Sequence, residues 1–151
     1  MKNANLFNAM IARYNALSFT HNYIYGFIYK KMVYIVKTDA SMMPYVLMLD
    51  KASRGAGFSL RFKPNTSQKI LLISKGAQIL CSQEAFEQAL EESKYNRGEI
   101  FEKMVTELFG QVWEKDNVPF TDDGDLTVDG IAYQIKFEKA TFANERQLAR
   151  L

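Results

Sequence analysis

The sequence predicts a fold of the α+β or α/β class, in which helices pack on a β-sheet. Short β-rich segments lie between residues 33 and 73, two amphipathic helical stretches follow residue 82, and an Asp-Gly turn joins two alternating runs near residue 130. The 151 residues are the length of one ordinary domain. An apolar fraction of 48% and a charged fraction of 24% are typical of a globular chain that buries a core.

The first part of the chain, residues 1–81, is expected to hold a helix followed by a small antiparallel sheet. Mixed apolar spacing favours a helix over residues 4–31. The expected strands are VYIVK (33–37), YVLML (45–49), FSLRFK (58–63) and KILLI (69–73). Turn-forming residues such as Pro44 and Gly57 separate them. In the third strand, alternation puts Arg61 and Lys63 together on the solvent side.

Residues 82–151 form the second part, which begins with two expected helices. Ser82 is suited to cap the helix SQEAFEQALEESKY, which turns Phe86 inward. Asn96 and Glu99 have the spacing of a capping box at the start of the next helix. One apolar stripe follows, made of Phe101, Met104, Val105 and Leu108. Gly110 is expected to end this helix, before a short strand QVWE (111–114) and a loop.

Charge is divided unevenly between the two parts. Residues 1–81 carry 11 Lys and Arg against 2 acids, a net charge of +9, whereas residues 82–151 carry 8 basic and 15 acidic residues, a net charge of −7. This division is expected if one part holds a polyanion and the other holds divalent cations. Two solvated faces would explain the same counts equally well. The candidates for phosphate contact in the basic part are Arg54, Arg61, Lys63 and Lys69.

Several classes of site are disfavoured by what the sequence lacks. Cys81 is the single cysteine and His21 the single histidine, so neither a disulfide, a Cys-His zinc site nor a nucleophilic triad is expected. No Gly-rich phosphate loop is present. Polar residues interrupt the apolar N-terminal stretch, so we expect no membrane span, no export and a cytoplasmic location.

Asp129-Gly130 is the strongest hairpin signal in the sequence. A two-residue turn there pairs Val128 with Ile131, Thr127 with Ala132, Leu126 with Tyr133 and Asp125 with Gln134. Asp125 and Gln134 then become cross-strand neighbours, with Cβ atoms roughly 4.5–5.5 Å apart. Lys136 and Glu138 project from the same face as Gln134, because side chains two apart on a strand share a side. A half-buried hairpin with a merely polar outer face is the alternative.

A carboxylate, an amide oxygen and an ammonium on one face suit metal-assisted phosphodiester hydrolysis. The two oxygens can ligate Mg²⁺ (or Mn²⁺), and the lysine can orient the nucleophile or offset charge in the transition state.

Asp125 followed by Gln134-Ile135-Lys136 resembles the PD-(D/E)XK nuclease motif in a variant with Gln in place of the second acid. The segment GEIFEKMV (98–105) looks like the first helix of the Holliday-junction-resolvase-like members, in which a helix glutamate reaches the metal. The resemblance covers residues 96–151. It implies a restriction-endonuclease-like core with a central mixed sheet flanked by helices.

The resemblance also implies roles for particular residues. Glu102 is favoured over Glu99 as the helix acid, because capping already explains Glu99, and Asp125 and Gln134 complete the metal set. Lys136 is the catalytic lysine, and Glu138 is a secondary ligand. A helix over residues 141–151 is expected to offer Arg146 to phosphates, although a solvated surface is at least as expected there.

The sequence departs from the family pattern at three places. No proline directly precedes Asp125, Gln134 removes one charge from the metal site, and the sequence stops after the final helix, where the family core has a further strand. The N-terminal sheet or a second subunit is expected to supply that strand, so a homo-oligomer is expected. Three functions remain open: a DNA endonuclease, a non-catalytic DNA-binding protein on the same scaffold, and a protein-interaction module.

Overall fold

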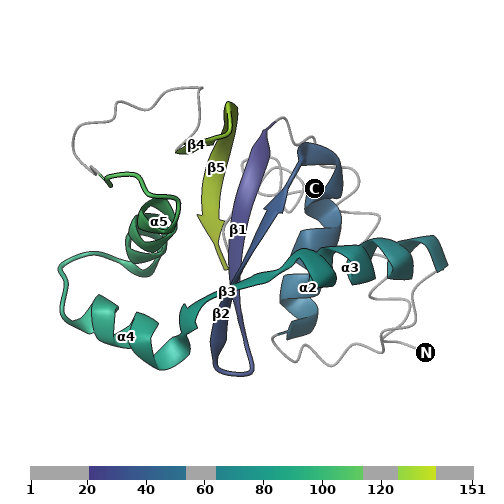
Figure 1. Cartoon of the computed structure of the whole chain (residues 1–151). Coiled ribbons are helices and arrows are strands. Elements are labelled where there is room, and N and C mark those ends of the chain that lie inside the picture. The colour runs from purple at the N-terminus through teal and green to yellow at the C-terminus, as the bar shows by residue number, and fades with distance from the viewer. Residues whose placement is uncertain (1–20, 54–63, 114–125, 139–151) are drawn as a thin grey trace, which may run out of the picture.

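The computed structural model describes residues 21–53, 64–113 and 126–138 (Figure 1). They form one five-stranded mixed sheet with helices on both faces, which confirms the expected central sheet. The strands are β1 (Asn22–Tyr29), β2 (Met32–Thr38), β3 (Gln78–Ser82), β4 (Leu126–Val128) and β5 (Ile131–Phe137). The helices are η1 (Ala40–Met42), α2 (Met43–Ser53), α3 (Pro64–Gly76), α4 (Gln83–Glu91) and α5 (Arg97–Leu108).

The sheet has the strand order β3-β2-β1-β5-β4. β1 runs parallel to β5, and the other neighbouring pairs are antiparallel. The sheet therefore combines strands from both parts of the chain. β1, from the N-terminal part, lies directly beside the strand that carries Gln134 and Lys136.

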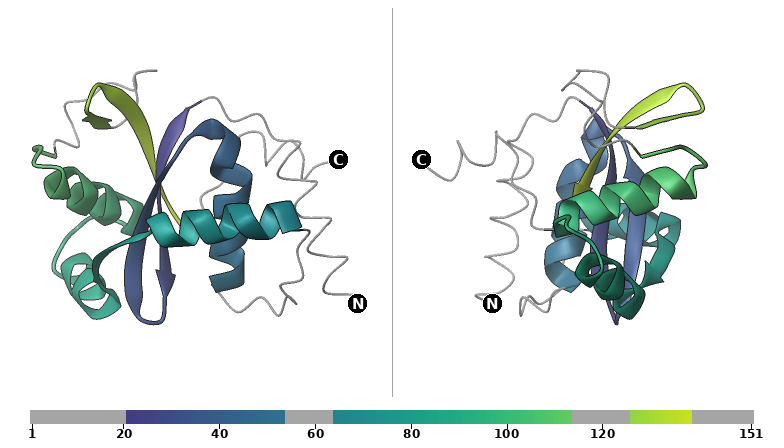
Figure 2. Two further views of the ribbon diagram at one scale, coloured as in Figure 1. Left: turned by 45° about the vertical axis from the view of Figure 1, so that its right-hand side comes forward. Right: turned by 90° about the vertical axis from the view of Figure 1, so that its left-hand side faces the viewer.

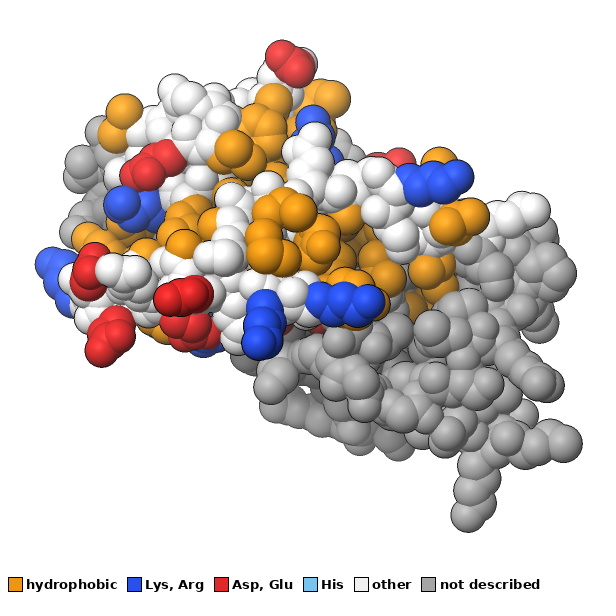
Figure 3. Space-filling model, turned by 60° about the horizontal axis from the view of Figure 1, so that its bottom comes forward, with side chains coloured by type: hydrophobic (Ala, Val, Ile, Leu, Met, Phe, Trp, Pro, Cys, Tyr) orange, Lys and Arg blue, Asp and Glu red, His pale blue; other side chains and the backbone are white. Residues whose placement is uncertain are grey.

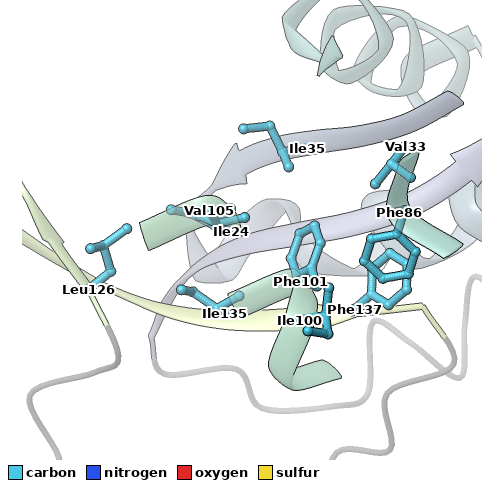
Figure 4. Packing of buried hydrophobic residues seen from close by; sticks show 10 residues of the cluster. All are labelled: Ile24, Val33, Ile35, Phe86, Ile100, Phe101, Val105, Leu126, Ile135 and Phe137. Carbon is cyan, nitrogen blue, oxygen red and sulfur yellow. The ribbon is translucent and has the colours of Figure 1, made fainter. Parts of the chain in front are cut away.

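Two apolar layers enclose the sheet. α2 and α3 cover one face and α4 and α5 the other, as both views in Figure 2 show. On the α2 face, Tyr23, Tyr25 and Phe27 of β1 pack with buried residues of α2. On the α5 face, ten buried residues pack together, from β1, β2, β4, β5, α4 and α5 (Figure 4). The sheet thus holds two cores, one on each side.

Four expected elements in the N-terminal part were wrong or lie outside the described residues. Residues 22–29 form β1 rather than the expected helix. β1 lies in the middle of the sheet and is buried on both faces, so its sequence lacks the apolar–polar alternation that indicates a strand. YVLML lies in α2 and KILLI lies in α3. A short apolar run does not distinguish a strand from a buried helix. FSLRFK lies outside the described residues, as does the helix expected over 141–151.

The two helices expected between residues 82 and 110 are confirmed as α4 and α5. Ser82 caps α4 by accepting from Ala85 N at 3.1 Å, and Asn96 caps α5 by accepting from Glu99 N at 2.9 Å. The predicted apolar stripe of α5 is confirmed only in part, because one of its members, Leu108, is 51% exposed. Residues 111–113 form no strand. Gly110 adopts a φ of 74°, and Gln111 N turns back to donate to Thr106 O at 3.1 Å.

The β4–β5 hairpin has the expected turn and register. Asp129 and Gly130 have φ angles of 53° and 80°, as a type I′ turn requires. Val128 pairs with Ile131, Thr127 with Ala132 and Leu126 with Tyr133. Gln111 follows α5 in the chain. Its Nε2 donates to Thr127 O at 2.6 Å and so connects the hairpin to that helix.

Candidate functional site

β5 separates apolar and polar side chains onto opposite faces of the sheet. Ile135 and Phe137 are buried against α5, both 8% exposed. Gln134 and Lys136 alternate with them and therefore project from the α2 face, where both are half-buried. The structure brings these two predicted site residues together on one strand.

Two tyrosines of β1 lie beside them. In the parallel register, Tyr23 is the partner of Gln134 and Tyr25 the partner of Lys136. Partnered residues share a face of a sheet, so all four side chains belong to the α2 face. Burial raises the pKa of Tyr23, which therefore stays a neutral phenol.

Asp125 lies outside the described residues. The described part of the hairpin follows the expected register through the pair Leu126–Tyr133, which is the pair next to Asp125 and Gln134 in that register. The pairing of Asp125 with Gln134 thus stays a prediction.

Glu102, the glutamate expected to reach the metal from a helix, lies on α5. It is half-buried on α5, one turn before the buried Thr106, whose Oγ1 donates to Glu102 O at 2.7 Å. α5 packs on the Ile135 side of β5. The structure therefore puts Glu102 on the helix that covers the face opposite Gln134. Glu99 lies in the first turn, and its N–H is engaged by the cap at Asn96.

Glu138 forms an ion pair. Its Oε1 accepts from Nε and Nη2 of Arg97 at 3.1 and 2.7 Å, and Nη1 of Arg97 donates to Glu87 at 2.8 Å. Burial lowers the pKa of Arg97, but the hydrogen bonds to the two glutamates outweigh it and raise the pKa overall. The Arg97 guanidinium also lies over the rings of Phe86 and Phe137, 5.4 and 5.7 Å from their centroids. Glu138 thus joins the end of β5 to α4 and α5, on the side of the sheet opposite Gln134 and Lys136. The expectation that Glu138 projects from the same face as these two residues is therefore wrong, and its role as a metal ligand stays a prediction.

A buried acid on the same face was missed by the sequence interpretation. Asp50 of α2 is 1% exposed, and Tyr25 Oη donates to its Oδ2 at 2.5 Å. Tyr25 is in turn the strand partner of Lys136. A signal existed in the sequence, because Met43, Val46, Leu47 and Asp50 have helical spacing. That spacing places an acid on the apolar stripe of a helix.

Tyr25→Phe is expected to lower the free energy of unfolding by about 2 kcal/mol, because a buried carboxylate loses a donor. The melting temperature should fall by about 4–8 °C for a chain of this size. Thermal unfolding followed by circular dichroism measures it. Tyr29→Phe, at a tyrosine that is 41% exposed, is the matched control and should change little. Equal melting temperatures for the two variants would contradict the role of the Tyr25–Asp50 bond.

Of the expected phosphate contacts, only Lys69 is described. It is exposed on α3, where its Nζ donates to Tyr45 Oη at 3.3 Å and lies 4.8 Å from the Tyr45 ring centroid. Arg54, Arg61, Lys63 and Arg146 lie outside the described residues.

Gln134 and Lys136 do not by themselves supply enough ligand atoms for a divalent cation. Gln134 offers one amide oxygen, and the ammonium of Lys136 cannot act as a ligand. Within residues 21–53, 64–113 and 126–138, no three His, Cys, Asp or Glu side chains gather as a metal site. The fit of Mg²⁺ therefore depends on the predicted pairing of Asp125 with Gln134, which would add a carboxylate.

In comparisons with known proteins, the chain matches no family model, no curated protein and no solved structure. None of the helices in the described segments is long and apolar enough to cross a membrane.

Proposed function

We propose that this protein is a metal-dependent endonuclease that hydrolyses phosphodiester bonds in DNA. The observation that carries the proposal is the polar face of β5. Gln134 and Lys136 project from it side by side, in a hairpin whose register leads to Asp125. The resemblance to the PD-(D/E)XK motif rests on the same three residues.

In this proposal, Asp125 and Gln134 hold Mg²⁺ or Mn²⁺ through a carboxylate and an amide oxygen. When bound, such an ion would supply an activated water and positive charge for phosphodiester hydrolysis. Lys136 orients the attacking water or offsets the negative charge that develops on the phosphate. Tyr25, the strand partner of Lys136, is held in place by its hydrogen bond to Asp50. Glu102 and Glu138, the other ligands expected from the sequence, belong to the α5 side of β5, so we do not assign them to an ion held by Gln134.

A second function, DNA binding without cleavage, is favoured by two observations. Gln134 stands where the motif has an acid, which leaves the metal site with one negative charge fewer. Glu102 lies on the helix over the opposite face of β5. A protein-interaction module whose basic part meets an acidic protein is the remaining alternative. For the two DNA functions, we propose a cytoplasmic protein that acts as a homo-oligomer.

The test is incubation of purified protein with plasmid, linear and branched DNA, with Mg²⁺ or Mn²⁺ and with EDTA. A nuclease cuts at least one of these DNAs with metal and none with EDTA. Salt-sensitive binding without cutting supports the non-catalytic alternative. If the protein neither binds nor cuts, both DNA functions are wrong.

Gln134→Glu offers a more specific prediction. A second carboxylate beside Asp125 should lower the Mg²⁺ concentration needed for half-maximal cleavage by roughly tenfold. A metal titration of the cleavage rate measures it. Gln78→Glu, which makes the same change at an exposed position on β3, is the control and should leave the titration unchanged. A Gln134→Glu titration that matches that of the wild type would place the metal elsewhere.

A further inference from the structure

The turn between β1 and β2 is made of two lysines in an uncommon backbone conformation. Lys30 and Lys31 have φ angles of 47° and 65°, both in the left-handed region, and both side chains are exposed. A two-residue hairpin turn of this kind favours Asn-Gly, because a β-carbon is strained there. The β4–β5 turn of the same sheet uses the favoured type of pair, Asp129-Gly130. Folding alone therefore favours other residues at positions 30 and 31.

An aromatic row leads from the core to this turn. The rings of Phe27 and Tyr34 stack with centroids 5.7 Å apart, and Tyr34 lies 6.5 Å from Tyr29. Tyr29 is 41% exposed, and Lys30 Nζ lies 5.3 Å from the centroid of its ring. The tip thus presents an aromatic surface beside two positive charges.

The tip is also anchored. Gln83 N, in the first turn of α4, donates to Lys31 O at 2.8 Å. The N-terminus of α4 therefore lies beside Lys31, where the positive end of the helix dipole adds to the lysine charges, and Glu84 in the same turn opposes them. Figure 3 brings the bottom of the Figure 1 view forward and shows basic side chains next to apolar ones on this face, with several acidic side chains on the left.

We propose that the Lys30–Lys31 tip binds the phosphate backbone of DNA, an inference that rests on the proposed action on DNA. Lysine ammonium groups contact phosphates without reading sequence, and a neutral Asn-Gly turn offers no such charge. The tip lies five strand positions beyond Tyr25, the partner of Lys136, which is roughly 16 Å at about 3.3 Å per residue. At about 3.4 Å per nucleotide, the tip holds the backbone about five nucleotides from the bond at Lys136.

The test compares the wild type with Lys30→Asn/Lys31→Gly, in which the favoured turn residues replace the lysines. We expect its melting temperature to rise by about 2–4 °C because the backbone strain is relieved. Its affinity for a labelled DNA duplex in EDTA should fall on the order of tenfold, and the slope of log affinity against log salt should weaken by about 1.8. Higher stability with weaker binding separates a binding role from a structural one.

Two further variants complete the experiment. Lys30→Arg/Lys31→Arg keeps the charges and should bind as the wild type does. Lys75→Asn/Lys94→Asn removes two charges from exposed positions elsewhere and should also leave affinity unchanged. The inference is overturned if Lys30→Asn/Lys31→Gly binds like the wild type, if the Lys75 and Lys94 control loses as much affinity, or if the wild type does not bind the duplex.

The inference and the proposed nuclease activity fail separately. If the wild type binds the duplex through the tip in EDTA but never cuts DNA with metal, the tip assignment stands and the nuclease proposal is wrong. If it cuts DNA but the tip variant binds normally, the nuclease proposal stands and the tip assignment is wrong.

Discussion

Gly26→Ala is expected to lower the free energy of unfolding by about 3 kcal/mol, because the α5 face of the sheet has no room for a methyl group. A β-carbon at Gly26 would lie 2.8 Å from Cδ1 of Phe137 and closer still to Cε1 and Cζ of Phe101. The two rings stack with centroids 4.6 Å apart, and Phe101 is fully buried. The melting temperature should fall by about 6–12 °C.

The matched control is Gly76→Ala at the end of α3, where an added β-carbon meets nothing within 4 Å. Gly76→Ala should be neutral or slightly stabilising, because alanine favours helix more than glycine does. Phe101→Leu should restore part of the stability of Gly26→Ala by making space for the methyl group. Equal unfolding curves for the two glycine variants would contradict the packing of α5 on β1.

Lys136→Ala is expected to lower the rate of metal-dependent DNA cleavage by about 10²–10³-fold, the usual effect of removing a group that stabilises transition-state charge. Affinity for DNA in EDTA should change far less, because Lys136 is half-buried on the strand and the tip lysines are exposed. Single-turnover cleavage at saturating protein separates the two effects.

Two variants control this result. Lys75→Ala removes an exposed lysine from α3 and should cleave at the wild-type rate. Lys136→Arg keeps the charge but replaces a compact ammonium with a planar guanidinium, so it should restore little activity. Melting temperatures of all variants show whether they fold. Full activity in a folded Lys136→Ala protein would remove this residue from the mechanism.

Elements with strong local signals could be predicted from the sequence. The Asp129-Gly130 turn, the pairing of Leu126 with Tyr133 and the cap at Asn96 depend on residues close together in the chain. The short apolar runs at residues 45–49 and 69–73 favour strands locally, but tertiary packing makes them parts of α2 and α3. The pairing of β1 with β5 joins residues more than a hundred positions apart, and nothing in either segment specifies it.

The candidate site could be predicted only in part for the same reason. The alternation along β5 places Gln134 and Lys136 on one face regardless of tertiary structure. Which helix covers that face is set by the packing of the whole sheet, so the sequence did not indicate that α5 lies on the other side. The neighbours Tyr25 and Asp50 come from β1 and α2, and only the folded chain brings them to Lys136.

The most direct test of the central proposal is the nicking rate of supercoiled plasmid by the wild type, Asp125→Ala and Lys136→Ala, each with Mn²⁺ and with EDTA. The proposal predicts nicking by the wild type with Mn²⁺ only, and loss of that nicking in both variants although both remain folded. Nicking that persists in both folded variants, or that continues in EDTA, would contradict a metal-dependent site on β5.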